Sequence, residues 1–538
     1  MGFGFSPPTE VGETIPANTE HAVSVTLPTW AANVAYEEGE AWVADKMTSG
    51  YPRFCIHFKI RELERWLEEN YGRENESAMV FPSNGAAQRC REFIKRRQDT
   101  MAHPQIRVLQ LATPKSAENG SAQAHVAVVF FPKELFPVAK QYWQHTGEGV
   151  SSRLAEYFLE QYTTANDAKD QSTYVEERFG RNLDVSRTEE AKGALRSRIA
   201  GHLCQHVDNV CADQIYLYPT GMTAINSAHR LSMAFNESDK NGLRSVCFGF
   251  PYTDTLKTLE KWGPGAIFYP RGTEQELNEL ESLLKSGTRI AALFCEFPSN
   301  PLLKSPNIVR ISKMAKDHDF LVIVDDTVGN MSNISVLPWV DMTVSSLTKI
   351  FSGDCNVMAG ALVLNHNGRH YTELKRIISA QFEDLFFALD ALYLERNSRD
   401  FAQRSHRTNA NAEAVVDLLR SRTDLVKEVY YPKGSDTQAN YDQVKVSDGG
   451  YGGLLSVVFK NPEHASTFFD AINIAKGPSL GTNFTLACPY TIIAHFLELD
   501  FVESCGVDRN LVRISIGLEE TKDLLERFER GLKACENS

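Results

Sequence analysis

The chain has 538 residues, a hydrophobic share of 42%, a charged share of 23% and a formal net charge of −13. This length exceeds one ordinary domain, and the acidic balance without a basic stripe argues against nucleic-acid binding. No apolar run approaches the roughly 20 residues that span a bilayer. The ten cysteines include no CxxC pair, which argues against a zinc site and a disulfide framework. We therefore expect a cytoplasmic protein that binds no nucleic acid, membrane or metal ion.

The first 160 residues are predicted to form a mixed α/β extension. Apolar runs at residues 21–27, 107–112 and 124–131 predict strands, the last of them buried because a turn-rich segment precedes it and Pro132 follows. No catalytic motif occurs here. The polar residues 160–174 are expected to be a linker.

Residues 161–430 are predicted to form a large α/β domain. Short apolar runs at residues 245–250, 266–269, 290–294, 321–324 and 342–345 alternate with helical patterns such as residues 274–285. This alternation indicates a mainly parallel sheet with helices on both faces. Ligands of such sheets bind outside the carboxyl ends of the strands.

Residues 431–538 are predicted to form a smaller α/β domain. It opens with a turn-rich stretch at residues 432–453, and it ends in a strand at residues 511–516 and an amphipathic helix at residues 520–534.

A lysine follows one of the predicted parallel strands in the segment Ser345-Ser346-Leu347-Thr348-Lys349. An amine at a strand end can reach a ligand and condense with an aldehyde, and the hydroxyls of Ser346 and Thr348 could hold a phosphate beside it. An exposed loop lysine is the plain alternative. The serine β-lactamase pattern S-x-x-K is also similar, but the partner motifs of that family are missing.

Two carboxylates end another strand, in Val322-Ile323-Val324-Asp325-Asp326. Burying an unpaired carboxylate is costly, so a cation should face at least one of them. A protonated pyridine nitrogen would serve, as in pyridoxal 5'-phosphate (PLP), where it maintains the electron sink. A magnesium-binding acid pair and a simple turn cap are the alternatives.

Two turns add candidate ligand-binding groups. Gly221 and Met222 begin a predicted helix, whose free backbone N–H groups suit a phosphate. Asn300 lies between Pro298 and Pro301 after a strand, where it could donate to a ligand or simply form the turn.

Two further side chains complete the set of candidates. Tyr252 follows a strand and could stack on a pyridine ring or pack on the surface. Arg513 lies inside an apolar strand and demands an anionic partner, either a substrate carboxylate or a structural acid.

The order and spacing of these motifs resemble the Cys/Met-metabolism family of fold-type I PLP enzymes over residues 170–535. The resemblance implies that Lys349 binds the cofactor and acts as general base, that Tyr252 stacks on its ring and that Asp325 pairs with its nitrogen. Phosphate and ring contacts are implied for these residues: Gly221, Met222, Asn300, Ser346, Thr348 and Arg178, the last reaching a neighbouring subunit. Substrate contacts are implied for Arg513, Ser479 and Asn300.

Within this family the long fungal cystathionine gamma-synthases are the most similar. They share HAVSVTLPTW, YEEGE and GYPRF between residues 21 and 54, VEERFGRNLD at residues 175–184, and KGPSLGTNFTLACPY at residues 476–490. Three departures separate this chain from the bacterial enzymes. Glu176 replaces an active-site tyrosine and Phe484 replaces a glutamate, which puts recognition of the amino donor in doubt. The motif after the lysine, at residues 353–356, also differs from the usual G-H-S-D.

The resemblance implies a transferase of methionine biosynthesis, performing γ-replacement on an O-acyl-homoserine, most simply the O-acetyl ester, with L-cysteine to give L-cystathionine. It also implies a homodimer or homotetramer with active sites shared between subunits. Three alternatives stay open: capture of the same vinylglycine-type intermediate by sulfide or by a carbon or nitrogen nucleophile, cystathionine lyase activity, and a catalytically silent subunit or regulator.

Overall fold

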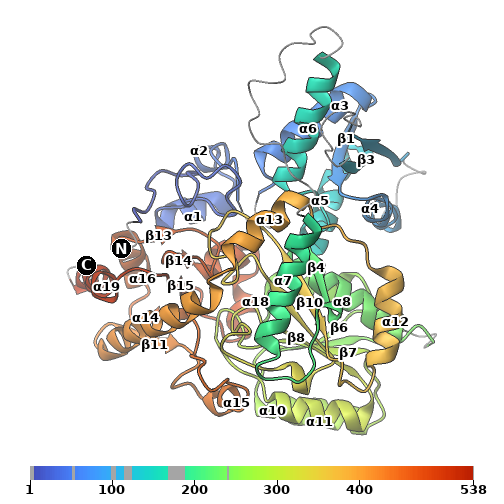
Figure 1. The fold of residues 1–538 in the computed structure, drawn as a ribbon. Helices are drawn as coiled ribbons and strands as arrows, with labels where there is room; N and C mark the ends of the chain where they lie inside the picture. The colour runs from blue at the N-terminus through green and yellow to red at the C-terminus, as the bar shows by residue number, and fades with distance from the viewer. Residues whose placement is uncertain are drawn as a thin grey trace.

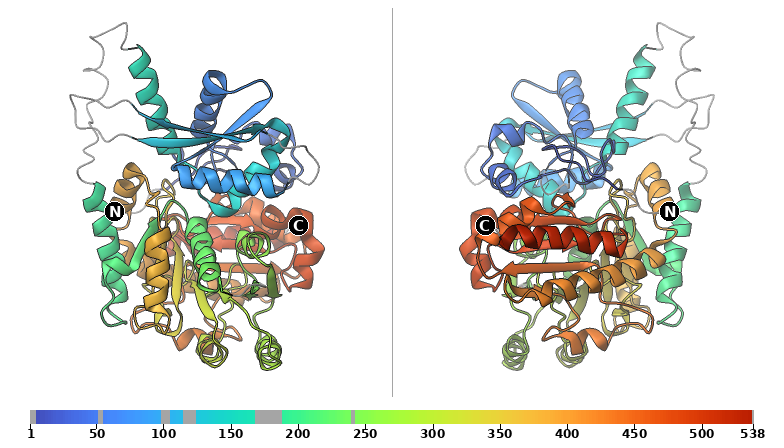
Figure 2. Two further views of the ribbon diagram at one scale, coloured as in Figure 1. Left: turned by 90° about the vertical axis from the view of Figure 1, so that its right-hand side faces the viewer. Right: turned by 90° about the vertical axis from the view of Figure 1, so that its left-hand side faces the viewer.

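The computed structural model describes residues 5–50, 55–97, 105–113, 124–167, 188–238 and 242–536. Within these residues three sheets follow one another along the chain, and each carries its own helices (Figure 1). Figure 2 shows the N-terminal sheet on one side of the molecule and the other two sheets side by side beneath it. The N-terminal and central sheets fall within the first two predicted segments, whereas the C-terminal sheet begins with β11 (Val426–Tyr430), just ahead of the predicted boundary at residue 430. The boundaries at residues 160 and 430 stay predictions.

The N-terminal unit is an antiparallel sheet in the order β1-β3-β2, flanked by four helices. Its elements are β1 (Glu76–Phe81), β2 (Arg107–Ala112), β3 (His125–Pro132), α3 (Phe58–Tyr71), α4 (Asn84–Arg96), α5 (Phe136–Thr146) and α6 (Ser152–Asp167). β3 is the central strand and is buried along most of its length, so its continuous apolar run packs on both faces. The strands predicted at residues 107–112 and 124–131 are confirmed to within one residue.

One prediction for this part of the chain was wrong, and a second lies partly outside the described residues. Residues 21–27 form no regular strand; a single bridge joins Thr14 to Val25, and the segment bonds through Val23 to Cys355 and through Leu27 to Lys476. The segment therefore lies against other units as a strap. The expected linker is helical as far as Asp167, and its remainder lies outside the described residues.

The central sheet has seven strands in the order β4-β10-β9-β8-β7-β5-β6, and β10 alone runs antiparallel to its neighbours. Its strands are β4 (Ile215–Tyr218), β5 (Ser245–Phe248), β6 (Ala266–Tyr269), β7 (Ala292–Glu296), β8 (Leu321–Asp325), β9 (Met342–Ser346) and β10 (Gly360–Leu364). All five predicted strands are present, which confirms the expected mainly parallel α/β sheet.

Side chains that alternate along these strands enter two separate cores. Val322 and Val324 of β8 pack into one core, whereas Leu321 and Ile323 pack into the other. Both faces of the sheet are therefore covered, and β8 carries an unbroken apolar run. Helices α7 (Thr188–Leu203) and α11 (Ile308–His318) lie against one core, and α8 (Gly221–Phe235) and α12 (Tyr371–Gln381) lie against the other.

The C-terminal sheet has five strands in the order β11-β12-β15-β14-β13. They are β11 (Val426–Tyr430), β12 (Leu454–Phe459), β13 (Ala475–Lys476), β14 (Leu486–Pro489) and β15 (Val512–Ser515). Helices α14 (Phe401–Ser421), α16 (Glu463–Ala471) and α19 (Thr521–Glu536) cover one face of it (Figure 2). The predicted final strand and helix are confirmed as β15 and α19. In the described part of the chain, no helix is both long and apolar enough to cross a bilayer.

Candidate active site

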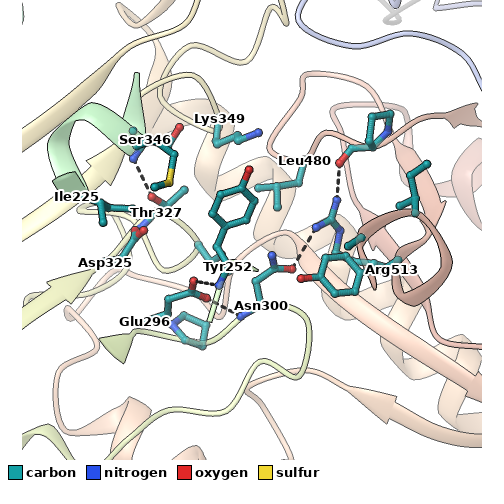
Figure 3. Close-up of a pocket in the computed structure, with 18 residues that line it drawn as sticks. Ile225, Tyr252, Glu296, Asn300, Asp325, Thr327, Ser346, Lys349, Leu480 and Arg513 are labelled. Atoms are coloured by element: carbon teal, nitrogen blue, oxygen red, sulfur yellow. Dashed lines mark hydrogen bonds between the residues drawn. The ribbon is translucent and has the colours of Figure 1, made fainter. Parts of the chain in front are cut away.

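A pocket lies at the carboxyl ends of β7, β8 and β9, where the N-terminus of α8 meets loops of the C-terminal unit (Figure 3). The residues that line it are Gly221, Met222, Ile225, Tyr252, Glu296, Pro298, Asn300, Asp325, Thr327, Val328, Ser346, Lys349, Pro478, Leu480, Tyr490, Ile493, Ala494 and Arg513. Eight of the eleven side chains expected to form the site belong to this set.

Lys349 is buried in the turn that follows β9. Its ammonium group donates to Ser479 Oγ over 3.2 Å, so Ser479 lies at the site without lining the pocket. Burial, with a further contribution from the charge of Arg513, lowers the pKa of Lys349 from 10.5 to about 7. A substantial fraction of this amine is therefore neutral near pH 7 and able to accept a proton.

Two carboxylates face the pocket from adjacent strands, since Glu296 of β7 pairs in register with Asp325 of β8. Burial raises the pKa of Glu296 to about 8, with the Asp325 charge as the next cause, and burial also raises the pKa of Asp325. Glu296 accepts hydrogen bonds from the backbone N–H groups of Tyr252 and Asn300, the latter over 2.9 Å. The Asp325 charge disfavours ionisation of Glu296, so the pair favours one protonated carboxyl group unless a cation faces it. Glu296 was not singled out from the sequence, although it begins the motif that contains Asn300.

The first turn of α8 closes the pocket beside Ser346. The Thr220 hydroxyl caps this helix by accepting from the N–H of Thr223, which leaves the N–H groups of Gly221 and Met222 near the pocket. A Cβ on Gly221 would lie 2.7 Å from Ser346 Cβ, so glycine permits the close approach. The buried Ser346 Oγ has no hydrogen-bond partner in the described part of the chain.

The structure places Thr348 differently from the expected phosphate contact. Its hydroxyl accepts from Ala359 N over 3.0 Å and donates to Ala359 O over 3.2 Å, so it joins the turn to the chain ahead of β10. The hydroxyl-bearing neighbour of Ser346 in the pocket is instead Thr327, whose Oγ1 accepts from Ser346 N over 2.7 Å. The sequence signal for Thr327 was its place directly after the two aspartates.

Arg513 enters from β15, on the opposite side of the pocket from Asp325 (Figure 3). Its guanidinium donates to Asn300 Oδ1 over 3.2 Å and to the carbonyls of Pro478 and Ser479, and it lies 4.8 Å from the centre of the Tyr490 ring. Among the described residues it forms no ion pair with a carboxylate. The Tyr252 ring lies between Arg513 and the Asp325 side of the pocket.

One residue singled out in the sequence, Phe484, lies away from this pocket. Phe484 is buried in an apolar cluster, where its ring stacks on that of Phe5 at 4.5 Å, and it does not line the pocket. Arg178 and Glu176 lie outside the described residues. Among the described residues, no group of three or more acidic, histidine or cysteine side chains could hold a metal ion.

Comparison with known proteins identifies two family models along the chain. The model described as "Cys/Met metabolism PLP-dependent enzyme" matches residues 173–533. The model described as "Fungal trans-sulfuration enzyme, N-terminal domain" matches residues 59–151.

Full-length relatives carry more than one activity in their names. The chain is 43% identical to a cystathionine gamma-synthase of Neurospora crassa, over 98% of this chain and 99% of that protein. It is 32% identical to an alanine racemase of Aspergillus violaceofuscus, over 98% of this chain and 96% of that protein. Among solved structures, a cystathionine gamma-lyase from yeast is similar with a TM-score of 0.55 and 25% identity, covering 65% of this chain and 87% of that one.

The pocket suits PLP in three independent respects. The unpartnered Ser346 hydroxyl and the helix N-terminus at Gly221 can accept a phosphate group. The buried Glu296–Asp325 pair offers a place for a protonated ring nitrogen. The Lys349 amine, with its lowered pKa, can condense with an aldehyde. The chain therefore belongs to the Cys/Met metabolism family of PLP-dependent enzymes, in its cystathionine gamma-synthase-like branch.

Proposed function

We propose that this enzyme catalyses γ-replacement on an O-acyl-L-homoserine, with O-acetyl-L-homoserine and L-cysteine as substrates and L-cystathionine and acetate as products. The observation that carries the proposal is one pocket that holds Lys349, the Glu296–Asp325 pair and Arg513, an arginine that forms no ion pair with a carboxylate among the described residues. An amino acid whose carboxylate binds Arg513 would direct its α-carbon toward Lys349. The Neurospora relative supports this choice of reaction by its name.

The proposed contributions of the individual residues follow from their positions. Arg513, oriented by Asn300, binds the substrate carboxylate through its two N–H edges. PLP, when bound, serves as the electron sink that acidifies the protons on the α- and β-carbons. Asp325 holds the proton on the ring nitrogen. Lys349 moves the protons, because a substantial fraction of its amine is neutral near pH 7.

The bonds balance without an external oxidant or reductant. The Cγ–O bond of the ester breaks, and acetate leaves with the electron pair. The cysteine sulfur then forms a bond to Cγ and loses its proton. The apolar side chains of Ile225, Leu480 and Ile493 line the space for the four-carbon skeleton and limit access of water.

Replacement of Lys349 tests the proposal directly. We expect Lys349→Ala to abolish formation of cystathionine from O-acetylhomoserine and cysteine, measured by mass spectrometry, with an unchanged circular dichroism spectrum. Lys476→Met is the matched control, because Lys476 is also buried, has a pKa lowered to about 8 by burial, and lies outside the pocket. Retained γ-replacement in Lys349→Ala would contradict the proposed function.

A wild-type protein that shows no visible absorbance after incubation with PLP would favour a catalytically silent subunit instead.

A different nucleophile is the second candidate, and one observation favours it. The side chain at position 484 is a buried phenylalanine in an apolar cluster. Glu296 and Asp325 are the acidic residues that line the described pocket, and both face the proposed cofactor. The described residues therefore offer no separate carboxylate for the amino group of cysteine. Incubation of the enzyme and O-acetylhomoserine with cysteine, sulfide, or a carbon or nitrogen nucleophile, each followed by product masses, distinguishes these reactions. Cystathionine supplied alone tests for lyase activity.

We further propose a homodimer, or a dimer of such dimers, in which Arg178 reaches the partner subunit's phosphate site. The support is the match to the family over residues 173–533. Inactive Lys349→Ala and Arg178→Ala subunits, unfolded and refolded together, should regain about a quarter of wild-type activity, since random pairing gives hybrids with one intact site. Recovery of no activity in verified hybrids would place Arg178 in its own subunit's site or outside both.

A further inference from the structure

A second cleft, of about 710 Å³, lies where the N-terminal unit meets the central unit. Helices α4 and α5 form one wall, and α8 with the loop after α9 (Thr253–Lys261) forms the other. It shares no lining residue with the catalytic pocket. Its volume lies within the range of about 300–1,000 Å³ that is typical of small-molecule sites.

Cationic side chains dominate this cleft, although the protein as a whole carries a net charge of −13. Arg89 and Arg230 both form ion pairs with the buried Glu148, whose Oε1 lies 2.8 Å from Arg89 Nη2 and 3.7 Å from Arg230 Nη1. Arg96, Arg97 and Lys261 also line the cleft, and none of these three forms an ion pair with a carboxylate in the described part of the chain.

The remaining charges near the cleft do not balance this cluster. Glu92 also lines the cleft, but its carboxylate accepts from Lys95 over 3.2 Å. Burial lowers the pKa of Lys261, and the charges of Lys257 and Arg97 lower it further, while Glu260 and Asp254 raise it by smaller amounts.

Two buried polar atoms of the lining also lack partners. Asn226 is 2% exposed, and its Oδ1 accepts no hydrogen bond within the described residues. The buried Nε1 of Trp262 donates to no acceptor among them. Buried polar groups are rarely left unsatisfied, and each such group in a native protein calls for an explanation. A ligand that offers both a donor and an acceptor would satisfy them.

We propose that this cleft binds a small polyanion, a molecule with at least two phosphate or carboxylate charges and a hydrogen-bonding group beside them. Arginine side chains suit such groups, because the guanidinium fork can bind two anionic oxygens at once. The site is separate from catalysis: Asn226 and Arg230 follow Met222 by one and two turns of α8, on the part of this helix beyond the catalytic pocket.

Calorimetric titration of the PLP-loaded enzyme tests this site. Inorganic pyrophosphate and citrate serve as the phosphate and carboxylate probes, at constant ionic strength set with KCl. We expect saturable binding of at least one probe, weakened at least about tenfold in the double variant Arg96→Gln, Lys261→Gln. The matched control is Lys313→Gln, Arg376→Gln, which removes two exposed cations that do not line the cleft and should change the affinity less than about twofold.

A second variant keeps the test independent of the removed cations. Asn226→Asp preserves the shape of the side chain and places a negative charge in the cleft, so it should also weaken binding. The proposal is overturned if neither probe binds saturably, or if both cleft variants bind like the wild type. It is equally overturned if only Arg513→Lys weakens binding, because the probe would then occupy the catalytic pocket.

Discussion

At the scale of single residues, the chemistry depends on the charges around Lys349. Its amine is buried near the Arg513 guanidinium, and both effects disfavour the protonated form. Arg513, in turn, has its N–H groups on neutral oxygens of Asn300, Pro478 and Ser479. The site therefore presents a basic amine and a cation able to bind a carboxylate, which is the pair an amino acid substrate needs.

The protonation of Lys349 can be followed by chemical labelling. A neutral amine reacts with acetic anhydride and an ammonium group does not, so labelling rises as pH passes the pKa. In the apoenzyme we expect half-maximal labelling of Lys349 near pH 7, measured by peptide mass spectrometry. The exposed Lys313, whose pKa is raised by its hydrogen bond to Asp317, should still be gaining reactivity above pH 10. If labelling of Lys349 rose over the same pH range as labelling of Lys313, the lowered pKa of Lys349 would be contradicted.

The fork of Arg513 is expected to determine substrate affinity. Arg513→Lys keeps the charge but loses two-point binding of the carboxylate and the contact with Asn300. We expect the KM for O-acetylhomoserine to rise about 10- to 100-fold, with a smaller change in kcat. Steady-state kinetics measure this, with the exposed Arg376→Lys as control. An unchanged KM would show that the carboxylate binds elsewhere.

At the scale of elements, the N-terminus of α8 packs closely against the carboxyl end of β9. The helix can approach Ser346 because residue 221 has no Cβ, and its cap is the Thr220 side chain. The strand and the helix together position an unpartnered hydroxyl beside free backbone N–H groups. A phosphate site thus results from the packing of two elements, with little contribution from long side chains.

Gly221→Ala should weaken PLP binding at least about tenfold, because the new methyl group would force α8 away from Ser346. Cofactor titration, followed by absorbance, measures the change. Gly201→Ala in α7 is the control, since a Cβ there meets nothing within 4 Å. That variant should bind PLP normally and gain roughly 0.5–1 kcal/mol of stability. Equal cofactor affinity in the two variants would show that the close approach is unimportant.

At the scale of the whole molecule, buried charges fix the N-terminal unit to the central one. Arg153 of α6 donates to Asp390 of α13 (Ala388–Asn397) over 3.1 Å, both side chains are 5% exposed, and the guanidinium lies 4.0 Å from the centre of the Tyr393 ring. Removal of one partner would leave the other charge buried and unpaired.

Arg153→Ala is therefore expected to destabilise the protein by about 3–5 kcal/mol, seen as a lower urea midpoint. The double variant Arg153→Met, Asp390→Leu should recover much of the loss, because no isolated charge remains. A urea midpoint for Arg153→Ala equal to that of the wild type would show that the ion pair contributes nothing across this interface.

Deletion of residues 1–160 should expose the same interface and lower both the activity and the oligomer size.

The sequence by itself determined the central sheet and most of the active site. Each parallel strand is buried on both faces, so its apolar run is local and continuous, and the residue after each run must lie at the carboxyl edge. Lys349, Asp325, Asn300 and Tyr252 were predicted in this way, and the structure brings all four to one pocket. The order of the motifs also gave the family, which the comparisons confirm.

The tertiary structure alone decided the features that depend on contacts between distant segments. Thr348 and Thr327 have identical side chains, so the sequence does not distinguish them. The path of the turn after β9 determines which of the two hydroxyl groups faces the pocket. Phe484 packs on Phe5 in an apolar cluster that also contains Ile15 and Val23 of the N-terminal segment, and neither residue has a local pattern that predicts this contact. The cationic cleft likewise combines Arg96 and Lys261, which are 165 positions apart, and only packing of the two units brings them together.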